Sequence, residues 1–326
     1  MYAKNLFRIN DIIIDHLHDD VSTLRQCSLV CKEWLPAARF HIFSVVHLSL
    51  YSIDQMLEVV FYPGSPIPQY IRDLHIIDGQ GREFDPKWVN QKFSLVALSS
   101  MTCISSLLLE QVDFSGFSGA TMAALRGITA RVTRLELMYV RFKDLDGCLA
   151  FLGAAVSLRS LTSFITIFEA ETWSSHPVIA TILPELVELE LEDDKDPLLD
   201  LSSFFDRTPS DMNAEGIDLS KNPNLKNIIF GPNSSQWIVK ILDTAAPALE
   251  RVYMQLPSDY FDFPSLTRIF MGEGSGLRRT GIILSNLDLG ACSAIIGWLE
   301  DTTNEPGRIQ VRDHEISLRD LRPEFM

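Results

Sequence analysis

The chain has 326 residues, 46% of them hydrophobic, and a formal net charge of −15 with a pI near 4.9. Its length allows one large domain or two unequal ones, and its charge argues against binding to DNA, RNA or anionic membranes through a basic face. No stretch reaches the roughly 18 uninterrupted apolar residues of a transmembrane helix, and the first residues do not resemble a secretory signal. The five cysteines are odd in number and mostly far apart, which favours a reducing compartment over a disulfide framework. We therefore expect a cytoplasmic or nuclear protein that contacts no nucleic acid and no membrane.

Helical spacing begins close to the N-terminus, over residues 9–18. Three apolar residues at intervals of four form one face of this predicted helix: Ile9, Ile13 and Leu17. The polar stretch HDDVST follows, in which Asp20 or Ser22 is suited to cap a second helix.

The second predicted helix carries a single apolar stripe. Its members recur at intervals of three, four and three residues: Leu24, Cys27, Cys31 and Trp34. Pro36 suits the first turn of a third short helix, where its missing N–H costs little. Three such short helices have little core of their own, so we expect them to pack against a neighbouring domain or a partner.

The two cysteines of the second helix raise the alternatives of a metal site and a redox pair. Cys27 and Cys31 have no two further ligands at zinc-binding spacing, and they do not form a C-x-x-C motif. We therefore interpret both as small buried hydrophobic residues, and we expect no metal ligand among them.

The segment IIIDHLHDDVSTLRQCSLVCKEWLPAARFHIF (residues 12–43) resembles an F-box, in the form common in mushroom-forming fungi. The stretch SLVCKEW, the proline two residues after its tryptophan and the closing Arg-x-x-x-Phe lie where the family has them. The resemblance covers residues 5–46, and it departs from the family at Asn5 and Leu6, where a Leu-Pro pair is usual. It implies a three-helix module that docks on the Skp adaptor of a cullin–RING ubiquitin ligase. It also implies that six residues contact the adaptor or directly support that contact: Ile9, Ile13, Leu17, Leu24, Val30 and Trp34.

An apolar-x-x-apolar-x-apolar pattern recurs through the rest of the chain. Its copies occupy residues 71–76, 104–109, 132–137, 186–191, 225–230, 249–254 and 266–271, with a weaker copy at 158–163. Their mean spacing of about 28 residues lies in the range of leucine-rich repeats. Segments with helical spacing stand between or after several copies, at 118–128, 145–156, 235–247 and 291–302. The pattern predicts an α/β fold in which strand and helix alternate and the strands form a curved parallel sheet.

This part of the chain resembles the divergent leucine-rich repeats that often follow F-boxes. The alternative is an irregular α/β domain whose strands share a common motif. The repeat interpretation predicts one buried residue per strand, in register: Leu74, Leu107, Leu135, Leu189 and Ile228. The residues between the apolar positions should then share one open surface: Arg72, Arg134, Glu136, Glu188, Glu190, Lys226 and Arg251.

Negative charge is concentrated between Glu185 and Asp218, where twelve acidic and two basic residues give a net charge of −10. Two interpretations are open: a solvated loop that aids solubility, or a patch that binds a basic partner. In the second interpretation the residues that contact the target are Glu188, Glu190, Asp193, Asp194 and Asp196.

Motifs of the common catalytic classes are missing from the sequence, including a nucleophile elbow, a Walker A loop, a zinc-protease helix and a dinucleotide fingerprint. We therefore expect no catalytic residue and no cofactor. The expected organisation is an F-box module (1–48), a connector (49–70), a repeat domain that binds the target (71–302) and a C-terminal tail (303–326). The expected function is that of a substrate-recognition subunit of a Skp–cullin–F-box ubiquitin ligase, linked to a cullin through the adaptor. A repeat scaffold without a ligase role is the alternative, and an enzyme of unrecognised type is a third hypothesis.

Overall fold

The structure is a computed structural model in which residues 10–78, 87–92, 98–168, 183–192, 222–230, 249, 251–255, 281–285, 308–311 and 314–317 are described. The chain divides into two compact units, Met1–Arg134 and Leu135–Met326. Both combine helices with parallel strands, so the α/β class expected from the sequence is confirmed.

The first unit starts with three short helices, formed by residues 10–15, by α2 (Val21–Val30) and by α3 (Leu35–Phe43). Asp20 caps α2, because its carboxylate accepts the backbone N–H of Thr23 at 3.0 Å. Pro36 lies in the first turn of α3, as the sequence predicts.

The prediction that Leu24, Cys27, Cys31 and Trp34 lie on one helix is wrong. Helix α2 ends at Val30, Cys31 is extended, and Trp34 precedes the first residue of α3. Cys31 has φ of −159° and ψ of 167°, an extended conformation, so α2 cannot continue to Trp34.

Strand β1 (Val45–Ser49) follows α3 after Ser44 alone, and it was not predicted. The stretch FSVVHL has the apolar spacing of the other copies, but its first apolar residue also ends a helix. β1 pairs in parallel with β2 (Asp73–Ile77), which pairs in parallel with β3 (Ser106–Glu110). The first strand of this sheet therefore spans the domain boundary expected between residues 48 and 49.

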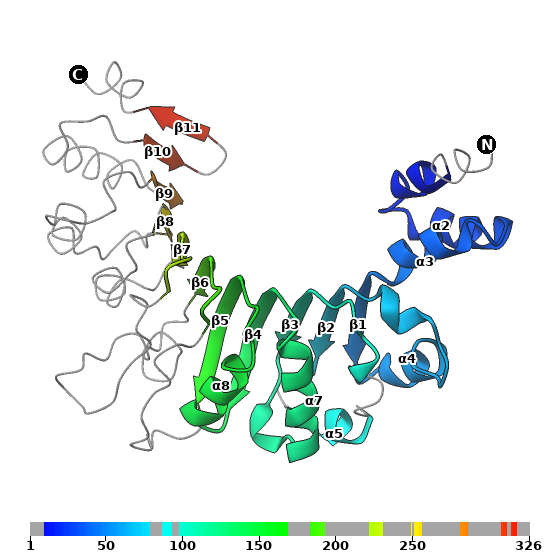
Figure 1. The fold of residues 1–326 in the computed structure, drawn as a ribbon. Helices are drawn as coiled ribbons and strands as arrows, with labels where there is room; N and C mark the ends of the chain where they lie inside the picture. Colours follow the sequence, from blue (N-terminus) through cyan, green and yellow to red (C-terminus); the bar gives the residue numbers. More distant parts are fainter. Residues whose placement is uncertain are drawn as a thin grey trace, which may run out of the picture. The chain divides into compact units, whose positions relative to one another are not determined.

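Short helices connect the strands of the first unit: α4 (Ile53–Val59), η1 (Ile67–Tyr70), α5 (Lys87–Lys92), η2 (Phe114–Gly116) and α7 (Gly119–Thr129). Helix α7 confirms the helix predicted over residues 118–128. Figure 1 shows α4, α5 and α7 gathered on one side of the strands. Asn90 joins three of these elements, because its side chain donates to the carbonyl of Gly116 and accepts from the backbone of Ser118 and the hydroxyl of Thr121, each at 2.8 Å.

The second unit contains β4 (Arg134–Phe142), which begins at the boundary between the units, followed by α8 (Leu145–Leu152) and β5 (Ser160–Phe168). Its further strands are β6 (Glu188–Glu192), β7 (Asn227–Phe230), β8 (Arg251–Gln255), β9 (Gly281–Ser285), β10 (Arg308–Val311) and β11 (His314–Ser317). The strands lie side by side in chain order (Figure 1). Strands β5 to β10 are parallel, and β11 turns back antiparallel to β10.

Two details of the second unit correct the prediction. The strand that pairs with β8 is β9, at residues 281–285, whereas the expected neighbour at 266–271 lies outside the described residues. The sequence did not reveal β9 because Arg279 stands where the pattern has its first apolar residue. The expected tail at 303–326 contains β10 and β11. The helices predicted at 235–247 and 291–302 lie outside the described residues.

Alternating burial along the strands produces the cores of both units. All five residues predicted to be buried are buried: Leu74, Leu107, Leu135, Leu189 and Ile228. Leu74 pairs with Leu107 in the first unit, and Leu189 pairs with Ile228 in the second, so the predicted register is confirmed for these pairs.

A recurring backbone contact sets this register at the start of each strand. The carbonyl of Ser44 accepts the N–H groups of both Arg72 and Asp73, at 2.8 and 2.9 Å. The carbonyl of Val187 in the second unit accepts those of Lys226 and Asn227 in the same way, at 2.8 and 3.0 Å. Each strand therefore positions the entry of the next one through main-chain atoms, whatever the side chains at these positions are.

Candidate protein-interaction surfaces

The N-terminal helices expose several large apolar side chains. Leu29 is 85% exposed and Val30 is 63% exposed, both in the last turn of α2. Ile12, Ile13 and Val21 are also exposed. We call these exposed side chains of two consecutive helices the N-terminal apolar surface: Ile12, Ile13, Val21, Leu29 and Val30. Several large apolar side chains exposed within one short segment are a feature of places where another protein binds.

The structure divides the residues expected to serve the adaptor between this surface and the core. Ile13 and Val30 are exposed, Leu17 and Trp34 are half-buried, and Leu24 is completely buried. Leu24 therefore supports the surface from within, whereas Ile13 and Val30 are free to contact a partner. Ile9 lies outside the described residues.

Sequence reasoning missed Leu29, the most exposed large apolar residue in the part of the chain that the structure describes. The apolar stripe of α2 drew attention to the side that packs against α3. Leu29 lies off that stripe, so its apolar side chain at a solvent-facing position was the available signal.

A small core holds the three helices together. Ile14, Leu24 and Ala38 are completely inaccessible to solvent. Cys27, one turn after Leu24, is also buried, and its thiol is free. Cys27 thus behaves as the small hydrophobic residue that the sequence predicts. In the described part of the chain, no three His, Cys, Asp or Glu side chains gather as metal ligands would.

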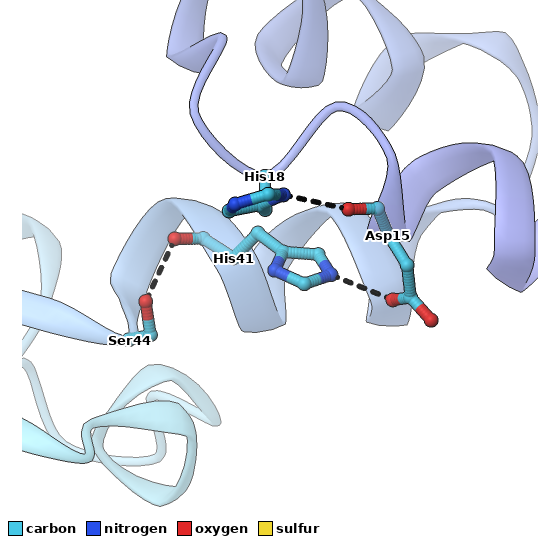
Figure 2. A network of polar contacts seen from close by, with 4 residues as sticks. All are labelled: Asp15, His18, His41 and Ser44. Carbon is cyan, nitrogen blue, oxygen red and sulfur yellow. Dashed lines mark hydrogen bonds and ion pairs between the residues drawn. The ribbon is translucent and has the colours of Figure 1, made fainter.

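Polar contacts fix the first helix on α3 (Figure 2). His41 Nε2 lies 2.8 Å from Asp15 Oδ1, and His41 is largely buried while Asp15 is exposed. His18 Nδ1 donates to the main-chain carbonyl of Asp15 at 2.9 Å, and Ser44 Oγ donates to the carbonyl of His41 at 3.0 Å. These bonds orient the segment that carries Ile12 and Ile13 relative to the end of α3.

The helices are also attached to the sheet of the first unit. The guanidinium of Arg72 lies 5.7 Å from the centroid of the Phe40 ring, in cation–π range. Ser44 is the only residue between α3 and β1, and its carbonyl bonds to the start of β2. The N-terminal apolar surface therefore stands on a framework that continues into the β-sheet.

The second unit presents two carboxylates on the open side of its sheet. Glu188 and Glu190 alternate with the buried residues Leu189 and Leu191, so both point away from the core. Their Oε2 atoms accept hydrogen bonds from neighbouring strands, Glu190 from the Thr162 hydroxyl at 3.0 Å and Glu188 from the amide of Asn227 at 3.3 Å.

The other residues expected on the open surface have mixed placements. Arg72, Arg134 and Lys226 are exposed, Glu136 is half-buried, and the side chain of Arg251 is not described. The acidic residues Asp193, Asp194 and Asp196 lie outside the described residues. The structure thus brings together Glu188 and Glu190 of the five residues expected to contact a target.

Comparison with known proteins found no family model that matches the chain and no curated protein that matches it. Within the part of the chain that the structure describes, none of the helices combines the length and the apolar character needed to cross a membrane.

Proposed function

We propose that this chain is a substrate-recognition subunit of a Skp–cullin–F-box ubiquitin ligase. Its N-terminal helices would bind the Skp-type adaptor, and its strand-rich remainder, a divergent leucine-rich-repeat domain, would bind the target. The observation that carries the proposal is the N-terminal apolar surface, which lies within the segment that resembles an F-box.

Two features support a docking role for this surface. Its apolar side chains are exposed while the helices keep a closed core beneath them, so the exposure is not a sign of incomplete packing. Protein interfaces commonly depend on a few apolar anchors of this kind, surrounded by contacts that contribute less.

The attachment of α3 to β1 supports the second half of the proposal. A recognition subunit acts by holding a target lysine near the charged ubiquitin-conjugating enzyme, which raises the effective concentration of the lysine. Such a device works best when the adaptor-binding part and the first strands are joined without a flexible linker. Ser44 alone separates the helix from the strand here.

The test is affinity purification of the full chain from cells, followed by mass spectrometry for Skp-type adaptors and cullins. Leu29→Arg is the informative variant, because an arginine in the last turn of a helix is compatible with the helix dipole while it places a charge on the surface. Val156→Arg is the matched control, because Val156 is 56% exposed, lies in the second unit and undergoes the same change of charge. The proposal expects adaptor and cullin with the wild type and the control, and neither with Leu29→Arg.

A second candidate function is a binding scaffold without a ligase role, in which the N-terminal helices only cover the edge of the sheet. The direct connection of α3 to β1 and the contact between Arg72 and Phe40 favour it, because capping units of repeat proteins need such contacts. The same purification separates the two functions. A scaffold would be recovered without an adaptor, and Leu29→Arg would leave its set of partners unchanged.

A further inference from the structure

The open side of the sheet in the second unit carries an aromatic pair that was not predicted from the sequence. The rings of Tyr139 in β4 and Phe164 in β5 meet edge to face, with their centroids 4.8 Å apart. Tyr139 is 38% exposed and Phe164 is half-buried, although aromatic residues of this size are usually buried when a core is within reach.

The backbone of β4 deviates from regular strand geometry at Tyr139. Burial alternates along β4 until Met138 and Tyr139, which are both outside the core, and then resumes at Val140. Tyr139 has φ of 55°, a left-handed conformation that a bulky residue rarely adopts. An extra residue of this kind is a β-bulge, which redirects a side chain relative to the sheet.

Glu190 is a diagonal neighbour of one ring of this aromatic pair. Phe164 pairs with Glu192, and Thr162 pairs with Glu190, so Phe164 and Glu190 are diagonal neighbours on one face. Two residues along a strand and one strand across correspond to about 8 Å. The hydroxyl of Thr162 donates to Oε2 of Glu190 at 3.0 Å, so the neighbouring strand orients this carboxylate.

The two positions that pair directly with Glu190 are uncharged. Its paired positions are Thr162 on one side and Ile229 on the other, followed by Tyr253. Glu188 differs, because Arg251 stands in its row at the second strand along. Among the described residues, neither glutamate takes part in an ion pair. A carboxylate that is oriented by a hydroxyl and has an aromatic ring as its diagonal neighbour is complementary to a flat organic cation.

We propose that this face, formed by Tyr139, Phe164 and Glu190, binds an arginine side chain of a target protein. The guanidinium would stack on the aromatic pair and donate to the carboxylate of Glu190. Arginine fits better than lysine, because its planar, weakly hydrated cation stacks on rings and offers a fork of donors, whereas an ammonium is a strongly hydrated point charge. The inference rests on the proposed function only in taking the second unit as the target-binding part.

The test is a fluorescence polarisation titration of the full chain with three labelled octapeptides. They share a Gly/Ser framework and carry arginine, lysine or the neutral isostere citrulline at the same three positions. We expect the arginine peptide to bind about three- to fivefold more tightly than the lysine peptide, as one exposed cation–π contact allows, and the citrulline peptide to show no binding.

Variants distinguish this site from the general attraction of an acidic chain. Phe164→Leu and Tyr139→Asn leave the net charge unchanged, and asparagine tolerates the left-handed backbone at position 139. Both variants should remove the preference for arginine over lysine. Glu190→Gln should weaken the binding of both the arginine and the lysine peptide. Glu185→Gln makes the same change of charge at an exposed position before β6, and it should leave the preference for arginine intact.

Equal binding of the arginine and lysine peptides to the wild type would overturn the proposal, as would an unchanged preference in both aromatic variants. Thermal unfolding followed by circular dichroism shows whether each variant is folded. Adaptor binding is measured on the same preparations. Retained adaptor binding with no arginine preference would reject this site and leave the proposed function standing.

Discussion

Replacing Leu107 with alanine tests the alternation that underlies the sheet of the first unit. Leu107 is completely buried in β3, where it pairs with Leu74 of the neighbouring strand. The change removes methylene and methyl groups from a packed interior and leaves a cavity, which costs about 2–5 kcal/mol in free energy of unfolding.

The adjacent residue provides the matched control. Leu108 is chemically identical and lies in the same strand, but it is only half-buried on the open side. Its replacement by alanine removes less apolar contact and creates no closed cavity, so we expect a cost of about 1 kcal/mol or less. Urea denaturation followed by far-UV circular dichroism measures both variants against the wild type. An equal cost for the two variants, or a larger cost for Leu108→Ala, would show that the two sides of β3 are assigned wrongly.

Three further predictions concern single side chains. The Thr23 hydroxyl and backbone N–H hold the pKa of Asp20 below its ordinary value of 3.8. The capping bond is therefore fully present above pH 3.8 and is lost as the pH falls through the lowered pKa. An NMR titration of the Asp20 carboxyl group should show this lowered pKa. Asp20→Asn should remove the pH dependence. Asn90→Ala should reduce the free energy of unfolding by about 1 kcal/mol in urea, because it removes the hydrogen bonds that join α5 to η2 and to the start of α7. Complete burial raises the pKa of the Cys148 thiol, so iodoacetamide at pH 8 should modify the half-buried Cys103 in the native protein and leave Cys148 unmodified until urea is added, as peptide mass spectrometry would show.

The strands were the most predictable part of the fold. Their period of two places Leu74 and Ile76 on one face and polar residues between them, and this alternation can be read directly from the sequence. Strand β1 was not predicted, because Phe43 fits both the end of a helix and the first position of the strand pattern. Helix and strand are alternatives when a sequence pattern is assigned, whereas the chain passes from α3 into β1 within one residue.

The candidate surfaces were less predictable, because exposure depends on tertiary packing. The apolar stripe of α2 was correct where it marked Leu24 and Cys27 as core residues, and it failed at the end of the helix. The position of Leu29 off that stripe marks it as a surface residue, but its exposure of 85% could be known only from the packing of α2 against α3. The bulge at Tyr139 had no sequence signal. Left-handed backbone positions are usually occupied by glycine or asparagine, whereas this one is occupied by tyrosine.

The most direct test of the proposed function is a calorimetric titration of the purified full chain with a purified Skp-type adaptor. The proposal predicts saturable one-to-one binding by the wild type, with a negative change in heat capacity because apolar surface is buried. It also predicts that Leu29→Arg loses about 2 kcal/mol or more of binding free energy, roughly thirtyfold in affinity, while Val156→Arg binds as the wild type does. No binding by a folded wild-type chain, or equal binding by Leu29→Arg, would contradict the assignment of the N-terminal helices to an adaptor.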